Sequence, residues 1–252
     1  MNLIKKLILG TTMAMSMAAA QADTITVDGV VWDPASSLDF SSASLAIRQL
    51  IAADGTLSGF GVINSLNGED SSSYCPGCQI TFTFGGYTPI NSGALPTTPG
   101  TVYGYTGGSV KVYVNHNAAT FVSNVNANGY TAAMFGLPGQ DLFLDLIGHQ
   151  IGNTTFTGTA SGQSQVTALT GFGVLDAIGG DAFVNFDTNT KDGGSDLAFS
   201  SSFTNVVSIT AANGTGNFDG DTVPGNTVPE PASLALAGLA LLGAGVARRR
   251  KA

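Results

Sequence analysis

Apolar and polar side chains alternate along much of this 252-residue chain, and the alternation constrains its fold more than any other feature. In residues 79–84, Ile80, Phe82 and Phe84 share one side of an extended segment, while polar side chains occupy the other side. A period of two is typical of a β-strand that is buried on one face. The same pattern recurs in residues 110–114, 142–146 and 197–203. We therefore expect an all-β protein.

Turn signals separate these segments: Asp28-Gly29, Asp54-Gly55, Asn67-Gly68, Asn128-Gly129 and Asp192-Gly193. The pair Asp54-Gly55 predicts a hairpin between residues 47–53 and 56–63, because both of its residues tolerate the left-handed backbone of a tight turn. The hairpin favours a strand from Ile47, although the apolar spacing of residues 41–53 would also fit a short helix.

Many short strands at close spacing predict a single β-sandwich domain of the jelly-roll type. A β-solenoid is the alternative, because Gly, Asn and Thr are abundant, but the chain shows no fixed repeat period. We assign this domain to residues 23–212, which are enough for one sizeable core. Residues 213–227, rich in Gly, Asn and Thr, are expected to form a flexible linker.

The first 22 residues have the pattern of a secretory signal peptide. Lys5 and Lys6 precede an uncharged apolar stretch. Small residues at Ala20 and Ala22 then fit the rule for cleavage before Asp23. An uncleaved N-terminal anchor is the alternative, but the apolar stretch is short for one. The body of the chain is therefore expected to be exported.

The last 25 residues combine an extended motif, an apolar span and a basic end. The motif is Val228, Pro229, Glu230 and Pro231, in which two prolines disfavour a helix. Residues 232–247 carry no charge and would reach about 24 Å as a helix, a marginal span of a hydrocarbon core of about 30 Å. The stop-transfer cluster is Arg248, Arg249, Arg250 and Lys251, which would hold the terminus on the cytoplasmic side.

This order of features in residues 228–252 resembles the PEP-CTERM sorting signal. The resemblance implies that Pro229-Glu230-Pro231 is recognised by an exosortase, a transpeptidase-like membrane protease, in a Gram-negative bacterium that makes exopolysaccharide. It implies export through the inner membrane, a transient or stable membrane anchor, and sorting to the cell surface or extracellular matrix. Residues 27–34, 74–78 and 185–189 also resemble the bodies of uncharacterised PEP-CTERM proteins, which implies no known activity.

The formal charge of −8 understates the acidity of the exported body. Six of the nine Lys and Arg residues lie in the two ends, whereas residues 23–228 hold sixteen acids against three cations, a net charge of −13. Such a surface repels nucleic acid and anionic lipid. We expect no nucleic-acid partner, and divalent cations or cationic partners are favoured without being required.

Cys75 and Cys78 are the two cysteines of the chain, and in an exported protein they predict one disulfide. A redox-active pair usually precedes a helix, but a strand is expected from Gln79 onward. Haem attachment would need a histidine at position 79. Zinc would need more ligands than His116 and His149 supply.

Asp187, Asn189 and Asp192 are candidate calcium ligands, because their oxygens are hard donors. The EF-hand spacing fails, since Lys191 stands where an oxygen ligand belongs, so a solvated turn is favoured and no cofactor is assigned. A similar cluster is formed by Asn217, Asp219 and Asp221. The chain shows no nucleophile elbow, phosphate loop, H-E-x-x-H motif or paired catalytic Glu, and we expect it not to be an enzyme.

These patterns predict a structural or adhesive protein of the surface or matrix, associated with exopolysaccharide or biofilm. The alternative is a carbohydrate-binding module, possibly calcium-dependent, in which Trp32 and tyrosines stack on sugars. A secreted hydrolase is the third hypothesis, and no catalytic constellation supports it.

Overall fold

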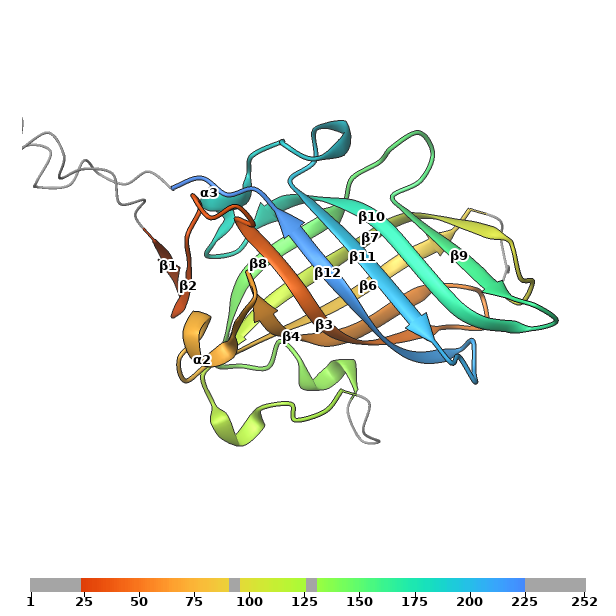
Figure 1. Cartoon of the computed structure of the whole chain (residues 1–252), viewed down its shortest axis with the longest axis horizontal. Helices are drawn as coiled ribbons and strands as arrows, with labels where there is room; N and C mark the ends of the chain where they lie inside the picture. The colour runs from red at the N-terminus through yellow and green to blue at the C-terminus, as the bar shows by residue number, and fades with distance from the viewer. Residues whose placement is uncertain (1–23, 91–95, 126–130, 225–252) are drawn as a thin grey trace, which may run out of the picture.

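The computed structural model describes residues 24–90, 96–125 and 131–224 (Figure 1). The strands are β1 (Ile25–Val27), β2 (Val30–Trp32), β3 (Phe40–Ile51), β4 (Leu57–Leu66), β5 (Glu69–Asp70), β6 (Gln79–Pro89), β7 (Val102–Asn115), β8 (Gln140–Gly148), β9 (Phe156–Gly162), β10 (Val166–Gly179), β11 (Leu197–Thr204) and β12 (Ala211–Gly220). The short helices are α2 (Ser71–Tyr74) and α3 (Phe183–Phe186), with 3-10 turns η1 (Ala118–Thr120), η2 (Ala132–Met134) and η3 (Asp192–Gly194). The expected all-β class is therefore correct.

Within these ranges, no helix is long and apolar enough to cross a membrane. The signal peptide expected in residues 1–22, the sorting signal in residues 228–252 and its apolar span in residues 232–247 lie outside the described residues.

Eight strands close into an antiparallel barrel in the order β11-β12-β3-β4-β6-β7-β8-β10, and β10 pairs again with β11. The ninth strand of the wall, β9, continues the line of β8. Along β10, β8 pairs from Leu175 to Gly179 and β9 pairs from Val166 to Gly173. On their other side, β8 and β9 both pair with β7, each along a different part of that strand.

The expected β-sandwich or jelly roll is therefore wrong, and so is the β-solenoid. A sandwich keeps two separate sheets, whereas here the main sheet closes on itself through the pairing of β10 with β11. Alternation of side chains shows which face of a strand is buried, but it does not show which strands are neighbours. The sequence pattern could therefore predict the strands without predicting the closure.

The hairpin predicted at Asp54-Gly55 is confirmed. β3 and β4 pair from Ile51↔Leu57 to Ser44↔Ser65, and Gly55 has a φ of 86°. The Asp54 carboxylate also accepts a hydrogen bond from the Thr56 backbone N–H at 2.9 Å. The preference for a strand over a helix before this turn is correct.

Aromatic rings fill the barrel interior, and inward-facing glycines make room for them. A Cβ atom at Gly61 would lie 2.3 Å from Cζ of Phe82, and one at Gly171 would lie 2.3 Å from Cζ of Phe156. The ring of Phe199 lies between those of Phe156 and Phe218, with centroids 6.1 Å and 4.8 Å away. The predicted inward side of residues 79–84 is confirmed, since Ile80, Phe82 and Phe84 are all buried.

A bulge changes the expected pattern in β8. The register against β7 shifts between Val112 and Tyr113, opposite Phe143. Leu144 and Leu146 are buried as predicted, but Phe143, expected on the outer side, is fully buried as well. The bulge lets its ring contact Trp32 at a centroid distance of 5.9 Å.

A second, smaller core lies outside the barrel wall. The segment between β7 and β8 crosses the outer face of β4 and packs Val122, Val125 and Phe135 against Phe60 and Val62. The rings of Phe60 and Phe135 are 4.9 Å apart. Both faces of β4 are therefore buried over residues 59–63, which explains why this stretch has no polar side chain.

One end of the barrel is covered by β1, β2, α2 and α3, and we call it the closed end (Figure 1). Trp32 of β2 lies at its centre, 5.7 Å from the ring of Phe40 and 5.8 Å from that of Phe186. The first and last described residues, Thr24 and Pro224, both lie at this end (Figure 1).

The boundary expected between domain and linker is corrected by β12. Residues 211–220 form a full barrel strand between β3 and β11, whereas the composition of the sequence predicts a flexible linker from residue 213. Gly214 and Gly216 face inward, where a Cβ would lie 2.4 Å from the ring of Phe203 and 2.6 Å from Ile47. Glycine here serves packing, and its abundance was misinterpreted as flexibility.

Candidate functional site at the closed end

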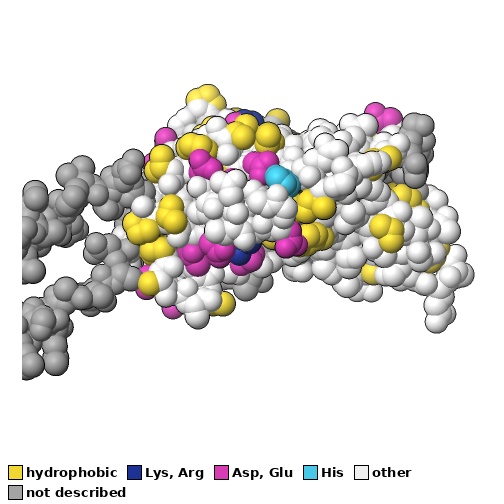
Figure 2. All heavy atoms as spheres, turned by 90° about the horizontal axis from the view of Figure 1, so that it is seen from above, with side chains coloured by type: hydrophobic (Ala, Val, Ile, Leu, Met, Phe, Trp, Pro, Cys, Tyr) yellow, Lys and Arg dark blue, Asp and Glu magenta, His cyan; other side chains and the backbone are white. Residues whose placement is uncertain are grey.

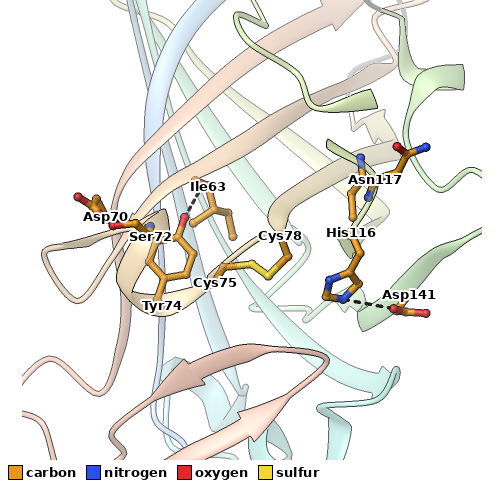
Figure 3. Close-up of a disulfide and its surroundings, with 10 residues drawn as sticks. Ile63, Asp70, Ser72, Tyr74, Cys75, Cys78, His116, Asn117 and Asp141 are labelled. Carbon is orange, nitrogen blue, oxygen red and sulfur yellow. Dashed lines mark hydrogen bonds and ion pairs between the residues drawn. A yellow bond between two sulfur atoms is a disulfide. The ribbon is translucent and has the colours of Figure 1, made fainter. Parts of the chain in front are cut away.

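Cys75 and Cys78 form a disulfide immediately before β6, with Cα atoms 5.2 Å apart (Figure 3). The turn between them places Gly77 at a φ of 78°, and the Cys78 N–H donates to the Cys75 carbonyl at 3.0 Å. The neighbouring Tyr74 hydroxyl donates to the Ile63 carbonyl at 2.7 Å. Both cysteines are buried, so the bridge fixes α2 to the barrel and is not an exposed redox pair.

Acidic side chains meet the tip of the β1–β2 hairpin beside this disulfide. Burial, and then the carboxylates of Asp181 and Asp141, raise the pKa of Asp28. His116 Nε2 lies 3.7 Å from the Asp141 carboxylate (Figure 3). Gly29 is close to the same ring, because a Cβ there would lie 3.3 Å from His116 Cε1. The hairpin tip is therefore held against a group of like charges.

The calcium candidates do not converge on one point. Asn189 donates to Asp187 at 3.4 Å, and Asp192 lies separately in η3. Lys191 bridges the second cluster, with its ammonium 2.9 Å from Asp219 and 3.1 Å from Asp221. Among the described residues, no three His, Cys, Asp or Glu side chains are grouped to hold a metal ion. The lysine occupies the position between carboxylates that a cation would need.

The charge of Lys191 is stabilised in this position. Burial alone would lower the pKa of the Lys191 ammonium, but its hydrogen bonds with Asp219 and Asp221 outweigh burial and raise the pKa. The two carboxylates are thus neutralised in part by a resident cation of the chain itself.

Asp196 organises the same loop, although no sequence pattern predicts this role. Its carboxylate accepts backbone N–H bonds from Ala177 at 2.8 Å, Thr188 at 2.8 Å and Asn189 at 2.7 Å. Only 2% of the residue is exposed. An Asp directly before a strand gives no distinctive signal, because its three partners come from two other segments of the chain.

The chain that leaves β12 is fixed by hydrogen bonds that we call the C-terminal clamp: Asp39, Trp32 and Asn185 holding Thr222 and Val223. The Thr222 N–H and hydroxyl both donate to the Asp39 carboxylate, and Trp32 Nε1 donates to the Thr222 hydroxyl at 3.0 Å. Val223 donates to the Asn185 carbonyl at 2.9 Å and accepts from its side-chain amide at 3.0 Å. The body is therefore ordered as far as residue 223.

The aromatic residues proposed to stack on sugars are mostly inside the protein. Trp32 is 3% exposed, and Tyr74, Tyr87 and Tyr105 are equally buried. A sugar-stacking platform needs an exposed ring face. The described tyrosine and tryptophan side chains at the closed end therefore do not form one.

A histidine on the barrel wall adjoins an apolar hollow. His149 Nδ1 pairs with the Asp176 carboxylate at 2.8 Å, beside a hollow of about 150 Å³ lined by Ile151, Phe172 and Val174 (Figure 2). Gly193 packs against the other ring nitrogen, since a Cβ there would lie 3.0 Å from Nε2. The pair joins the β8–β9 connection to β10 and η3.

A model of the PEP-CTERM protein-sorting motif matches residues 227–251. The match includes the four motif residues and the whole stop-transfer cluster named above. No curated protein and no solved structure matches the chain. The motif supports export, transient anchoring in the membrane and sorting by an exosortase, as the resemblance implied.

Proposed function

We propose that this exported exosortase substrate is a structural protein of the cell surface or extracellular matrix, with the barrel as a compact, non-enzymatic body. The observation that carries the proposal is the sorting motif at residues 227–251, immediately after a barrel whose interior is filled by side chains. The motif accounts for sorting of the exported protein, and the barrel is the stable body that is sorted.

The packed interior favours this function over transport of a small ligand. A hollow between Gln49, Tyr105 and Phe156 inside the wall measures about 20 Å³, which is room for about one water molecule. Ligand pockets are usually about 300–1,000 Å³. A barrel filled with aromatic rings is suited to durability outside the cell rather than to carrying cargo.

Sorting would proceed in three steps along the tail. Arg248, Arg249, Arg250 and Lys251 stall export, because cations are retained on the cytoplasmic side. The stalled span holds Pro229-Glu230-Pro231 just outside the bilayer, in an extended form that a protease cleft can accept. The exosortase then removes residues 232–252 and leaves the barrel outside the cell.

The test compares the surface fraction of cells that make the exosortase with that of cells lacking it. Intact mass should show loss of residues 232–252 only in the first strain. Replacing Pro229, Glu230 and Pro231 by Ala should keep the full tail and leave the protein in the membrane fraction. A wild-type surface protein that still carries Arg248–Arg250 would contradict the sorting step.

A second measurement addresses the role of the delivered barrel. Deleting the gene should weaken cohesion of the extracellular matrix, and the exported barrel should restore it. Binding of the exported barrel to a glycan array, measured with and without calcium, tests the alternative of a carbohydrate-binding module. Specific sugar binding that depends on calcium would replace the structural role by carbohydrate recognition.

A further inference from the structure

The described body ends very close to the sorting motif. The C-terminal clamp fixes the chain as far as Val223, and Pro229 of the motif follows only six residues later. An extended chain advances at most about 3.3–3.6 Å per residue. The distance from the clamp to the motif is therefore at most about 20 Å.

This reach selects one face of the barrel. The clamp lies at the closed end, together with the N-terminal hairpin (Figure 1). The wall is much longer than the reach, since the twelve residues of β3 extend about 40 Å along the strand. An enzyme that grips the motif must therefore work beside the closed end, and the opposite end points away from it.

The charge of the closed end indicates what kind of surface it can meet. Acidic side chains gather toward the end from which the termini leave (Figure 2). The carboxylates that the described contacts place there are Asp28, Asp39, Asp141, Asp181, Asp219 and Asp221, beside the ammonium of Lys191 and the imidazole of His116. Anionic lipid would repel this end within about one Debye length of roughly 8 Å. The surface that approaches it is therefore protein rather than lipid.

We propose that the closed end is the face that meets the sorting protease, and that the C-terminal clamp sets the distance between them. This inference rests on the proposed function, since it requires cleavage at the motif. The clamp gives the barrel a fixed orientation during processing, with its closed end toward the membrane and its opposite end toward the exterior.

The clamp makes a quantitative test possible. If Thr222 and Val223 were released, the last fixed residue would be Gly220 at the end of β12, nine residues before Pro229. Release would extend the reach from about 20 Å to about 30 Å. Deleting residues 225–227 would shorten it by about 10 Å. The two changes should therefore compensate each other.

The experiment measures the rate of tail removal from the full chain in cells that make the exosortase. The deletion of residues 225–227 should slow processing at least tenfold. Reinserting Gly-Ser-Gly should restore the wild-type rate, and so should adding Asp39→Ala, Thr222→Val and Asn185→Ala to the deletion, which together leave only the bond from the Val223 N–H to the backbone carbonyl of residue 185. Thr210→Val with Asn213→Ala, at the opposite end of β12, is the matched control and should restore nothing.

Each outcome has a defined meaning. Wild-type processing of the deletion would overturn the proposal, and so would failure of Gly-Ser-Gly to rescue it, because length would then not be limiting. Rescue by Gly-Ser-Gly but not by clamp release, in a variant whose Trp32 fluorescence shows a folded core, would overturn the role of the clamp. Absence of processing in the wild type would instead reject the proposed function itself.

Discussion

Gly171 is the position where the packing of the barrel can be tested most sharply. A Cβ added there would lie 2.3 Å and 2.7 Å from two ring atoms of Phe156 and 2.8 Å from the Ser201 hydroxyl. Favourable carbon contacts begin near 3.5 Å, so the methyl group would intrude by about 1 Å. Phe156 cannot retreat, because it is 5% exposed and its ring packs between Tyr87 and Phe199. Gly171→Ala should therefore cost about 1–3 kcal/mol of unfolding free energy.

The obstacle at Gly171 consists of side-chain atoms, so a second substitution should relieve it. Phe156→Leu removes the outer ring atoms and alone should cost about 1–2 kcal/mol. In the double variant the clash is absent, so the loss of unfolding free energy should be about 1–2 kcal/mol smaller than the sum of the two single losses. Gly158→Ala is the matched control: Gly158 is the cross-strand partner of Gly171, and its nearest contact to a new Cβ would be 3.5 Å.

Urea unfolding of the exported protein, followed through fluorescence, measures these changes. Trp32 is the sole tryptophan and is buried, so its emission reports loss of the core. Gly158→Ala should unfold within about 0.5 kcal/mol of wild type. If Gly171→Ala costs the same in the wild-type and Phe156→Leu backgrounds, the account of glycine as space for the ring is refuted.

Three further changes test the closed end. The raised pKa of Asp28 means that docking of the hairpin is favoured in acid and weakened as pH rises through that pKa. Asp28→Asn should therefore be more stable than wild type at pH 7 and nearly equal to it in acid, as measured by urea unfolding at each pH. Cys75→Ser should lower the unfolding free energy by at most about 1–3 kcal/mol, because the ring is short, and alkylation before mass spectrometry should find no free thiol in the wild type. The Tm of the wild type should not respond to millimolar calcium. Lys191→Gln frees Asp219 and Asp221, so the Tm of this variant should rise when calcium is added. No rise in the variant would contradict the view that the lysine occupies a cation position.

Local patterns predicted the elements of this fold but not their assembly. The alternation at Ile80, Phe82 and Phe84 and the turn at Asp54-Gly55 act over a few residues, so the sequence carries them directly. Closure depends on β10 pairing with β11 over eight residue pairs, and no local pattern specifies that partner. The bulge that turns Phe143 inward is hidden for the same reason, because the shift lies in the register with β7.

The same limit applies to the closed end. Cys75 and Cys78 could be paired from the sequence because they are three residues apart in an exported chain. The C-terminal clamp joins Asp39 to Thr222 and Trp32 to Thr222, contacts that span more than 180 residues. Nothing near Asp39 marks it as a partner of the C-terminus. The contact of Lys191 with Asp219 and Asp221 is hidden for a related reason, since it joins residues about thirty positions apart.

The spacing of the glycines in β12 distinguishes a strand from the flexible linker that their abundance predicts. Gly214, Gly216 and Gly220 are separated by even numbers of residues, which places all three on one face of a strand. A linker has no reason to keep that spacing, whereas a barrel strand facing aromatic rings does. Because β12 is a strand of the barrel, the folded body ends at the clamp at Val223 and not at residue 212. The sorting motif then follows the body at once, so the fold of β12, rather than a long spacer, determines how far the barrel stands from the enzyme that processes it.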